Sequence, residues 1–171
     1  MEYTTVNLLP EFEHRYKFKA GLYYTKTAKF ERVNIMLDLG CYNTLIPRYH
    51  AELSGSALGF WREYRIGGQI IKAEAFSIGK IMIGDFVIER VLAFAGEYPG
   101  DYEDEILLGT NVMNNWEMLI NKESNTFKFR ENPPAKLPNK THIYQNYFNP
   151  SGNYQYAQNS EQSITKAHEI A

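Results

Sequence analysis

The chain has little cysteine, no long hydrophobic run and no excess of charge of either sign. A single cysteine among 171 residues excludes a disulfide within one chain, so stability must come from a packed core. No apolar run approaches the roughly 20 residues that a membrane-spanning helix needs, and no charged-then-apolar leader is recognisable. We therefore expect a cytoplasmic protein without membrane association.

The charged residues give no general attraction to polyanions. There are 18 basic and 20 acidic residues, for a net charge of −2, which favours neither nucleic acid nor acidic membranes. Residues 15–32 interleave Lys and Arg with Tyr and Phe, as some single-strand-binding surfaces do. The same alternation is far commoner on the exposed face of a hairpin, so we expect no nucleic-acid partner. The four histidines are scattered without ligand spacing, and we expect no metal.

Alternating apolar and polar residues predict β-strands over most of the chain. About eight short strands with little helix indicate an all-β fold. The predicted strands cover residues 16–24, 29–36, 60–66, 69–76, 116–121 and 126–129, with further strands in 77–94 that Gly79 and Gly84 interrupt.

Two stretches depart from the strand pattern. Residues 49–58 are compatible with one or two helical turns, which Gly55 and Gly59 limit. After Glu131 a proline-rich linker leads into a segment rich in Asn, Gln, Ser and Tyr with few aliphatic residues. We predict one domain over residues 1–131 and a flexible C-terminal tail over residues 132–171.

Two short segments about seventy residues apart carry the candidate chemistry. In residues 34–47, an apolar strand ends at Asp38, and Gly40 follows two residues later, an arrangement that aims a carboxylate into a site. In residues 105–113, an apolar run ends at Leu108 and Gly109 before a short helix-like stretch. Between the two segments, Gly67 and Gly68 mark a two-residue hairpin turn, because such turns need positive φ.

Together these segments resemble the retropepsin-like aspartic proteases. In that family, hydrophobic-hydrophobic-Asp-Thr/Ser-Gly carries the catalytic acid, and hydrophobic-hydrophobic-Gly packs beside it. Residues 66–72, with Ile66, Gly67 and Gly68 at the tip, resemble the flap hairpin that closes over substrate. The resemblance covers residues 16–129 in order and spacing. It implies a closed acid-protease barrel with a flap hairpin and one short C-terminal helix, an extended polypeptide substrate, and no cofactor.

An aspartic protease needs two carboxylates, which hold one water between them and cannot both ionise at a separation of about 3 Å. The sequence holds one Asp-x-Gly, at Asp38, so the second aspartate must come from another copy across a two-fold axis. The resemblance thus implies a homodimer with Asp38 as acid and base. Gly40 would allow a close approach of its amide to the carboxylates, and Leu108 and Gly109 would support the floor of the site.

Leu39 stands where the family has Thr or Ser. The family's hydroxyl bonds backbone groups across the dimer axis, and its loss leaves a buried group unpaired at a cost of about 1–3 kcal/mol. Packing of Leu39 against its symmetry mate would offset up to roughly 1.5–3 kcal/mol. Two interpretations follow: an active homodimeric aspartic endopeptidase, or a catalytically inert peptide-binding or dimerisation module of the same fold.

Cys41 lies three residues after the candidate acid. A nucleophilic cysteine needs a neighbouring base, and no histidine lies next to Cys41 in sequence. We interpret it as a small buried residue that packs beneath the site.

Overall fold

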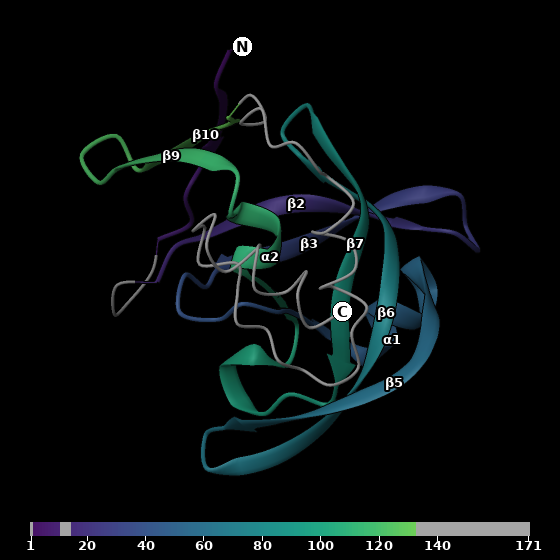
Figure 1. The fold of residues 1–171 in the computed structure, drawn as a ribbon. Helices are drawn as coiled ribbons and strands as arrows, with labels where there is room; N and C mark the ends of the chain where they lie inside the picture. Colours follow the sequence, from purple (N-terminus) through teal and green to yellow (C-terminus); the bar gives the residue numbers. More distant parts are fainter. Residues whose placement is uncertain (1, 11–14, 133–171) are drawn as a thin grey trace, which may run out of the picture. The chain divides into compact units, whose positions relative to one another are not determined.

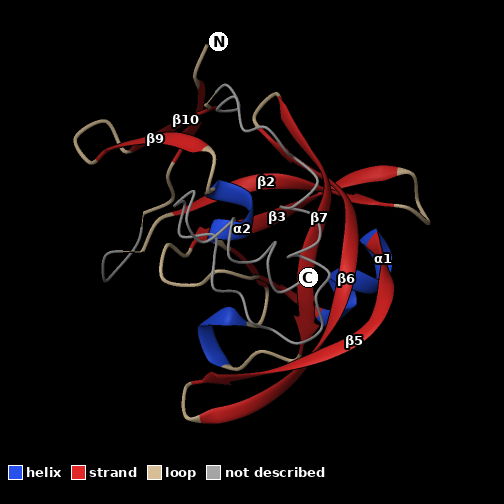
Figure 2. Cartoon of the chain, viewed as in Figure 1, coloured by secondary structure: helices blue, strands red, loops and turns tan. Residues whose placement is uncertain are grey.

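The computed structural model describes residues 2–10 and 15–132, and within them the chain is dominated by strands (Figure 2). The predicted tail lies outside the described residues apart from Asn132. No helix in the described part is long and apolar enough to cross a membrane. The elements are β1 (Thr4–Asn7), β2 (Lys17–Tyr24), β3 (Lys29–Leu37), β4 (Thr44–Pro47), α1 (Arg48–Ser54), β5 (Gly55–Ile66), β6 (Gln69–Ile83), β7 (Phe86–Gly96), the 3-10 turn η1 (Gly100–Tyr102), β8 (Glu105–Leu108), α2 (Thr110–Met113), β9 (Trp116–Asn121) and β10 (Thr126–Glu131).

Six of these strands close into a barrel. Their order is β2-β3-β8-β4-β7-β6, and the far end of β6 pairs back onto β2 at Gly21↔Met82 and Leu22↔Ile81. Closure leaves no open edge in the ring. β5 lies outside the ring and pairs with the first part of the long strand β6 (Figure 1). The predicted all-β closed barrel is confirmed.

Alternating side chains from the ring strands fill the barrel core. Ile35 of β3, Ile81 of β6 and Ile106 of β8 are completely buried and belong to one apolar cluster. Each such side chain stabilises the fold by about 1.5–3 kcal/mol relative to exposure. The core thus ties together strands that are far apart in sequence, including the two that carry the candidate motifs.

A second sheet, of order β1-β10-β9, packs on the same core. Its β10 residues Phe127 and Phe129 are completely buried, and Phe127 stacks on Phe18 of β2 with ring centroids 5.6 Å apart. The strand β1 was missed in the sequence because its four residues, Thr-Thr-Val-Asn, give too short a pattern. Its pairing with β10 is what makes it a strand.

The predicted hairpin turn at Gly67 and Gly68 is confirmed, as is the limit that Gly55 sets on the short helix, whereas the prediction for Gly79 is wrong. The helix α1 has about two turns and ends at Ser54, directly before Gly55, where β5 begins. At Gly55 an added Cβ would lie 2.4 Å from the Ser77 carbonyl oxygen, so this glycine brings β5 directly against β6. Gly79 does not interrupt its strand, because the β6–β7 pairing continues at Lys80. Gly84, with φ of +61°, does make the predicted turn.

Candidate active site

Asp38 directly follows the last residue of β3, beside the end of β8. The two strands pair in parallel with Leu37 opposite Leu108, and the Asp38 amide donates to the Leu108 carbonyl oxygen at 3.0 Å. Leu108 is completely buried, whereas Asp38 is half-buried. The two core strands therefore hold the backbone of Asp38 while its carboxylate stays accessible to solvent.

The residues after Asp38 form a tight turn. The Gly40 amide donates to Asp38 Oδ1 at 3.1 Å, and Leu39 is turned outward with 58% of its surface exposed. The expected close approach of the Gly40 amide is therefore present. Within the single chain, an added Cβ at Gly40 would lie 3.5 Å from Asp38 Oδ1, an ordinary contact.

Gly109 is the residue that brings the second motif against the Asp38 loop, which we define as residues 38–43. An added Cβ at Gly109 would lie 2.5 Å from backbone atoms of Tyr42 and Asn43. Just beyond, the Thr110 amide donates to the Cys41 carbonyl at 3.0 Å and the Asn111 amide to the Tyr42 carbonyl at 2.8 Å. The floor, Leu108 and Gly109, thus lies directly beside the loop.

Sequence reasoning missed Thr44 and Asn111, which connect the loop to the floor. The buried Thr44 hydroxyl accepts from the Gly109 amide at 3.1 Å and donates to Asn111 Oδ1 at 2.7 Å. Asn111 Nδ2 donates in turn to the Leu92 carbonyl of β7 at 2.9 Å. A threonine heading the apolar run Leu-Ile was the available signal, but nothing in the sequence identified its partners.

Cys41 is half-buried beneath the turn, and its Sγ donates to the Asn43 carbonyl at 3.2 Å. Burial and then the nearby Asp38 charge raise the pKa of the thiol above its ordinary value. Because the thiolate is the nucleophilic form, this environment disfavours nucleophilic chemistry at Cys41. Cys41 is half-buried, not fully buried as expected for a packing residue.

The flap tip is the turn between β5 and β6, which curve together along the lower side of Figure 1. Ile66 pairs with Gln69, and Gly67 and Gly68 have φ of +56° and +79°, as the predicted hairpin turn requires. Two residues before Ile66, burial raises the pKa of the Tyr64 phenol, and the neighbouring Asn43 side chain opposes that rise. The strand that leads into the flap therefore contacts the Asp38 loop.

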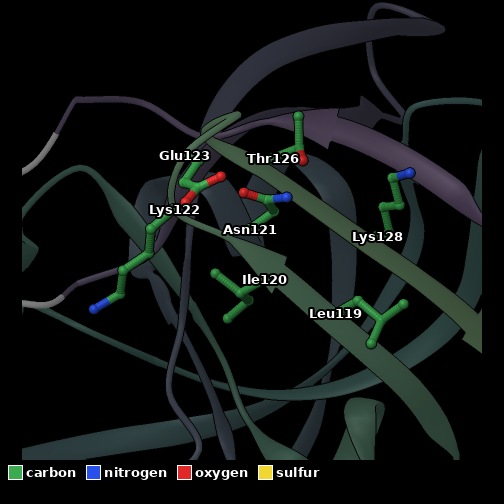
Figure 3. Close-up of a pocket in the computed structure, with 7 residues that line it drawn as sticks. All are labelled: Leu119, Ile120, Asn121, Lys122, Glu123, Thr126 and Lys128. Carbon is green, nitrogen blue, oxygen red and sulfur yellow. The ribbon is translucent and has the colours of Figure 1, made fainter.

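A shallow hollow elsewhere on the surface has no part in this arrangement. It has a volume of about 480 Å³, and Figure 3 shows its lining by the β9–β10 hairpin: Leu119, Ile120, Asn121, Lys122, Glu123, Thr126 and Lys128. None of these residues belongs to the Asp38 loop, the floor or the flap. In the part of the chain that the structure describes, no three His, Cys, Asp or Glu side chains gather as metal ligands would.

No protein-family model and no curated protein matches the sequence. Among solved structures, the chain is similar to a retropepsin-like aspartic protease from Rickettsia conorii. The TM-score is 0.49 and the identity 16%, with 75% of this chain and 91% of that chain covered. At this identity the likeness concerns the fold alone, and any chemistry of this chain rests on Asp38 and its surroundings.

Proposed function

We propose that this protein is a homodimeric aspartic endopeptidase that hydrolyses peptide bonds in extended polypeptides. The observation that carries the proposal is the placement of Asp38. Its carboxylate stays accessible at the end of β3, and its backbone is held by the Leu108 carbonyl at 3.0 Å. The Gly109 segment packs against the same loop without room for a side chain. The glycine-tipped β5–β6 hairpin supplies the flap.

The proposed reaction uses one water between two Asp38 carboxylates, one from each copy. The ionised carboxylate takes a proton from the water while the water oxygen attacks the peptide carbonyl carbon. The protonated carboxyl group donates its proton to the carbonyl oxygen. Collapse of the tetrahedral intermediate breaks the C–N bond: the leaving nitrogen takes the proton that the first carboxylate accepted from water, and a hydroxyl proton of the intermediate returns to the second carboxylate. One carboxyl keeps its proton because two like charges at about 3 Å do not both ionise.

The requirement for two carboxylates supports a dimer about a two-fold axis at the Asp38 turn. Leu39 and Gly40 are both exposed in the single chain, so this edge is open to a second copy. A leucine with 58% of its surface exposed gains about 25 cal/mol for each Å² that a partner covers.

The decisive experiment is cleavage of an unbiased peptide library between about pH 4 and 7 by the full chain and by Asp38→Asn. We expect discrete cuts by the native protein and a loss of about 10²- to 10⁴-fold in the variant, the usual contribution of one acid/base residue. Sedimentation of both proteins reports the oligomeric state independently. A dimer without any cuts would overturn the proposed activity.

The second candidate function is a catalytically inert module that binds an extended peptide or dimerises, and Leu39 is the observation that favours it. Leucine offers no hydroxyl to brace the paired aspartates. Replacement by threonine separates the two candidates. We expect Leu39→Thr to change the unfolding free energy of the single chain by no more than about 0.5 kcal/mol, because the side chain is exposed. A large gain of cleavage would identify the native site as inert, whereas a loss would show that leucine belongs to a working site.

A further inference from the structure

Two buried polar atoms near the Asp38 loop lack hydrogen-bond partners among the described residues. They are the Tyr64 hydroxyl, on the strand leading into the flap, and Asn43 Oδ1, at the end of the loop. The Tyr64 hydroxyl can donate a hydrogen bond, and Asn43 Oδ1 can accept one. Buried polar atoms are almost always paired, because an unmade hydrogen bond costs more than a made one contributes. The pair therefore needs an explanation.

The two side chains are neighbours. Burial raises the pKa of the Tyr64 phenol, and the adjacent Asn43 side chain acts in the opposite direction. The Tyr64 ring also packs edge-on against the buried Phe94 ring, with centroids 5.7 Å apart, so the direction of its hydroxyl is set. Rotation of the Asn43 amide exchanges its oxygen and nitrogen, and the terminal torsion of asparagine allows this readily. A rotamer of Asn43 with Oδ1 directed at the hydroxyl would satisfy both atoms.

Asn43 is well placed to transmit such a contact. Its carbonyl accepts the Cys41 thiol at 3.2 Å, and the same carbonyl would lie 2.5 Å from a Cβ at Gly109. Its side chain faces the flap strand through Tyr64. Asn43 thus meets the loop, the floor and the flap strand at one position.

We propose that the Tyr64 hydroxyl donates to Asn43 Oδ1 when the flap is closed, and that this latch couples flap closure to the position of the Asp38 loop. When the flap opens, water satisfies both atoms, so the bond adds to the stability of the closed state alone. Tyr64 and Asn43 are then positioning residues, since neither touches the reacting atoms. The consequence for cleavage rests on the proposed function, whereas the bond itself does not.

A double-mutant cycle on the full chain tests the latch without any need for activity. Amide hydrogen exchange in residues 63–72 is measured for the native protein, Tyr64→Phe, Asn43→Ala and the double variant. We expect each single variant to speed exchange by about 2- to 12-fold, the range for one hydrogen bond. The double variant should then be no faster than either single one. Additive effects, or unchanged exchange in Tyr64→Phe, would overturn the latch.

Tyr98→Phe is the matched control. The Tyr98 hydroxyl is also buried but donates to the Phe94 carbonyl at 2.6 Å, so its removal should lower global stability without selectively exposing residues 63–72. Should Asn43→Ala fail to fold, the contrast between Tyr64→Phe and Tyr98→Phe decides the question. Selective loss of protection in Tyr64→Phe supports the latch, and equal behaviour of the two variants overturns it.

Peptide cleavage adds a second readout. With an active native protein, Tyr64→Phe should raise KM by about 2- to 12-fold, the factor expected for amide exchange. The change in kcat should be smaller, because the latch stabilises the flap over bound substrate. A native protein that cleaves nothing, with coupled exchange in the cycle, would refute the proposed protease activity and leave the latch intact. A changed KM with unchanged exchange in the free protein would instead assign the two atoms to substrate contact and overturn the latch.

Discussion

The floor and the flap both depend on glycine, but for different physical reasons. At Gly109 an added Cβ would lie 2.5 Å from backbone atoms of the Asp38 loop, so glycine is needed for space. At Gly67 and Gly68 an added Cβ would meet nothing within 4 Å, but both residues have positive φ, so glycine is needed for backbone conformation. Packing holds the floor, whereas local turn geometry shapes the flap tip.

This difference assigns the two halves of the site different mechanical roles. Leu108 in the floor is completely buried, while Ile70 beside the flap tip has 62% of its surface exposed. Segments with few buried apolar contacts open at low free-energy cost, whereas core strands open only with the whole fold. In the proposed protease, the floor would hold the Asp38 carboxylate in a constant position while the flap tip moves over the substrate.

Gly109→Ala should have the largest effect on stability. The added methyl group meets backbone atoms of Tyr42 and Asn43, which cannot rotate away, so we expect a loss of about 1–3 kcal/mol or more in the unfolding free energy. Urea unfolding followed by the fluorescence of Trp61 and Trp116 measures it. Cleavage should fall as well, because the loop that carries Asp38 is displaced.

Gly40→Ala is the control for that prediction. The same methyl group would lie 3.5 Å from Asp38 Oδ1, so we expect a change of no more than about 0.5 kcal/mol in the single chain. Equal losses of unfolding free energy in Gly40→Ala and Gly109→Ala would show that crowding by backbone atoms is not the reason for the glycine at Gly109.

Gly68→Ala should have an intermediate effect that stays local. Its φ of +79° is unfavourable for alanine, with a strain of roughly 1–2 kcal/mol. We expect faster amide exchange in residues 63–72 and little change in the barrel strands. Gly68→Asn should be milder, because asparagine visits the left-handed region more readily. Loss of protection across the whole barrel would contradict the separation of flap and floor.

The smallest expected effect is a difference in the rate of cysteine alkylation, which compares burial in the Asp38 loop with burial beside the flap tip. Burial and the Asp38 charge raise the pKa of Cys41 above its ordinary value, so at any given pH below that pKa less thiolate is present than in an exposed cysteine. At pH 7.5 iodoacetamide should modify Cys41 more slowly than the exposed thiol of Ile70→Cys in a Cys41→Ala background.

Asp38→Asn removes one of the two causes of that raised pKa. We therefore expect Cys41 to react modestly faster in the variant, although burial keeps it slower than the flap thiol. Unchanged reactivity would show that the Asp38 charge does not reach the thiol.

Local patterns were sufficient to predict the hairpins. Gly67 and Gly68 flanked by alternating residues predict the turn, and the β5–β6 pairing has the predicted turn at its tip. Periodicity failed where contacts with distant residues decide the outcome. Gly79 remains inside β6 because β7 continues to pair beyond it, and the short strand β1 exists because β10 lies beside it.

The sequence by itself determined the strand pattern, the flap turn and the two motifs that frame the site, because alternation and glycine conformation are properties of neighbouring residues. Only the tertiary structure decided which residues hold Asp38. Thr44, Asn111 and Leu92 form a hydrogen-bonded chain across β4, α2 and β7, and Tyr64 meets Asn43 from another strand. The physical reason is barrel closure, which brings together groups that no local pattern relates.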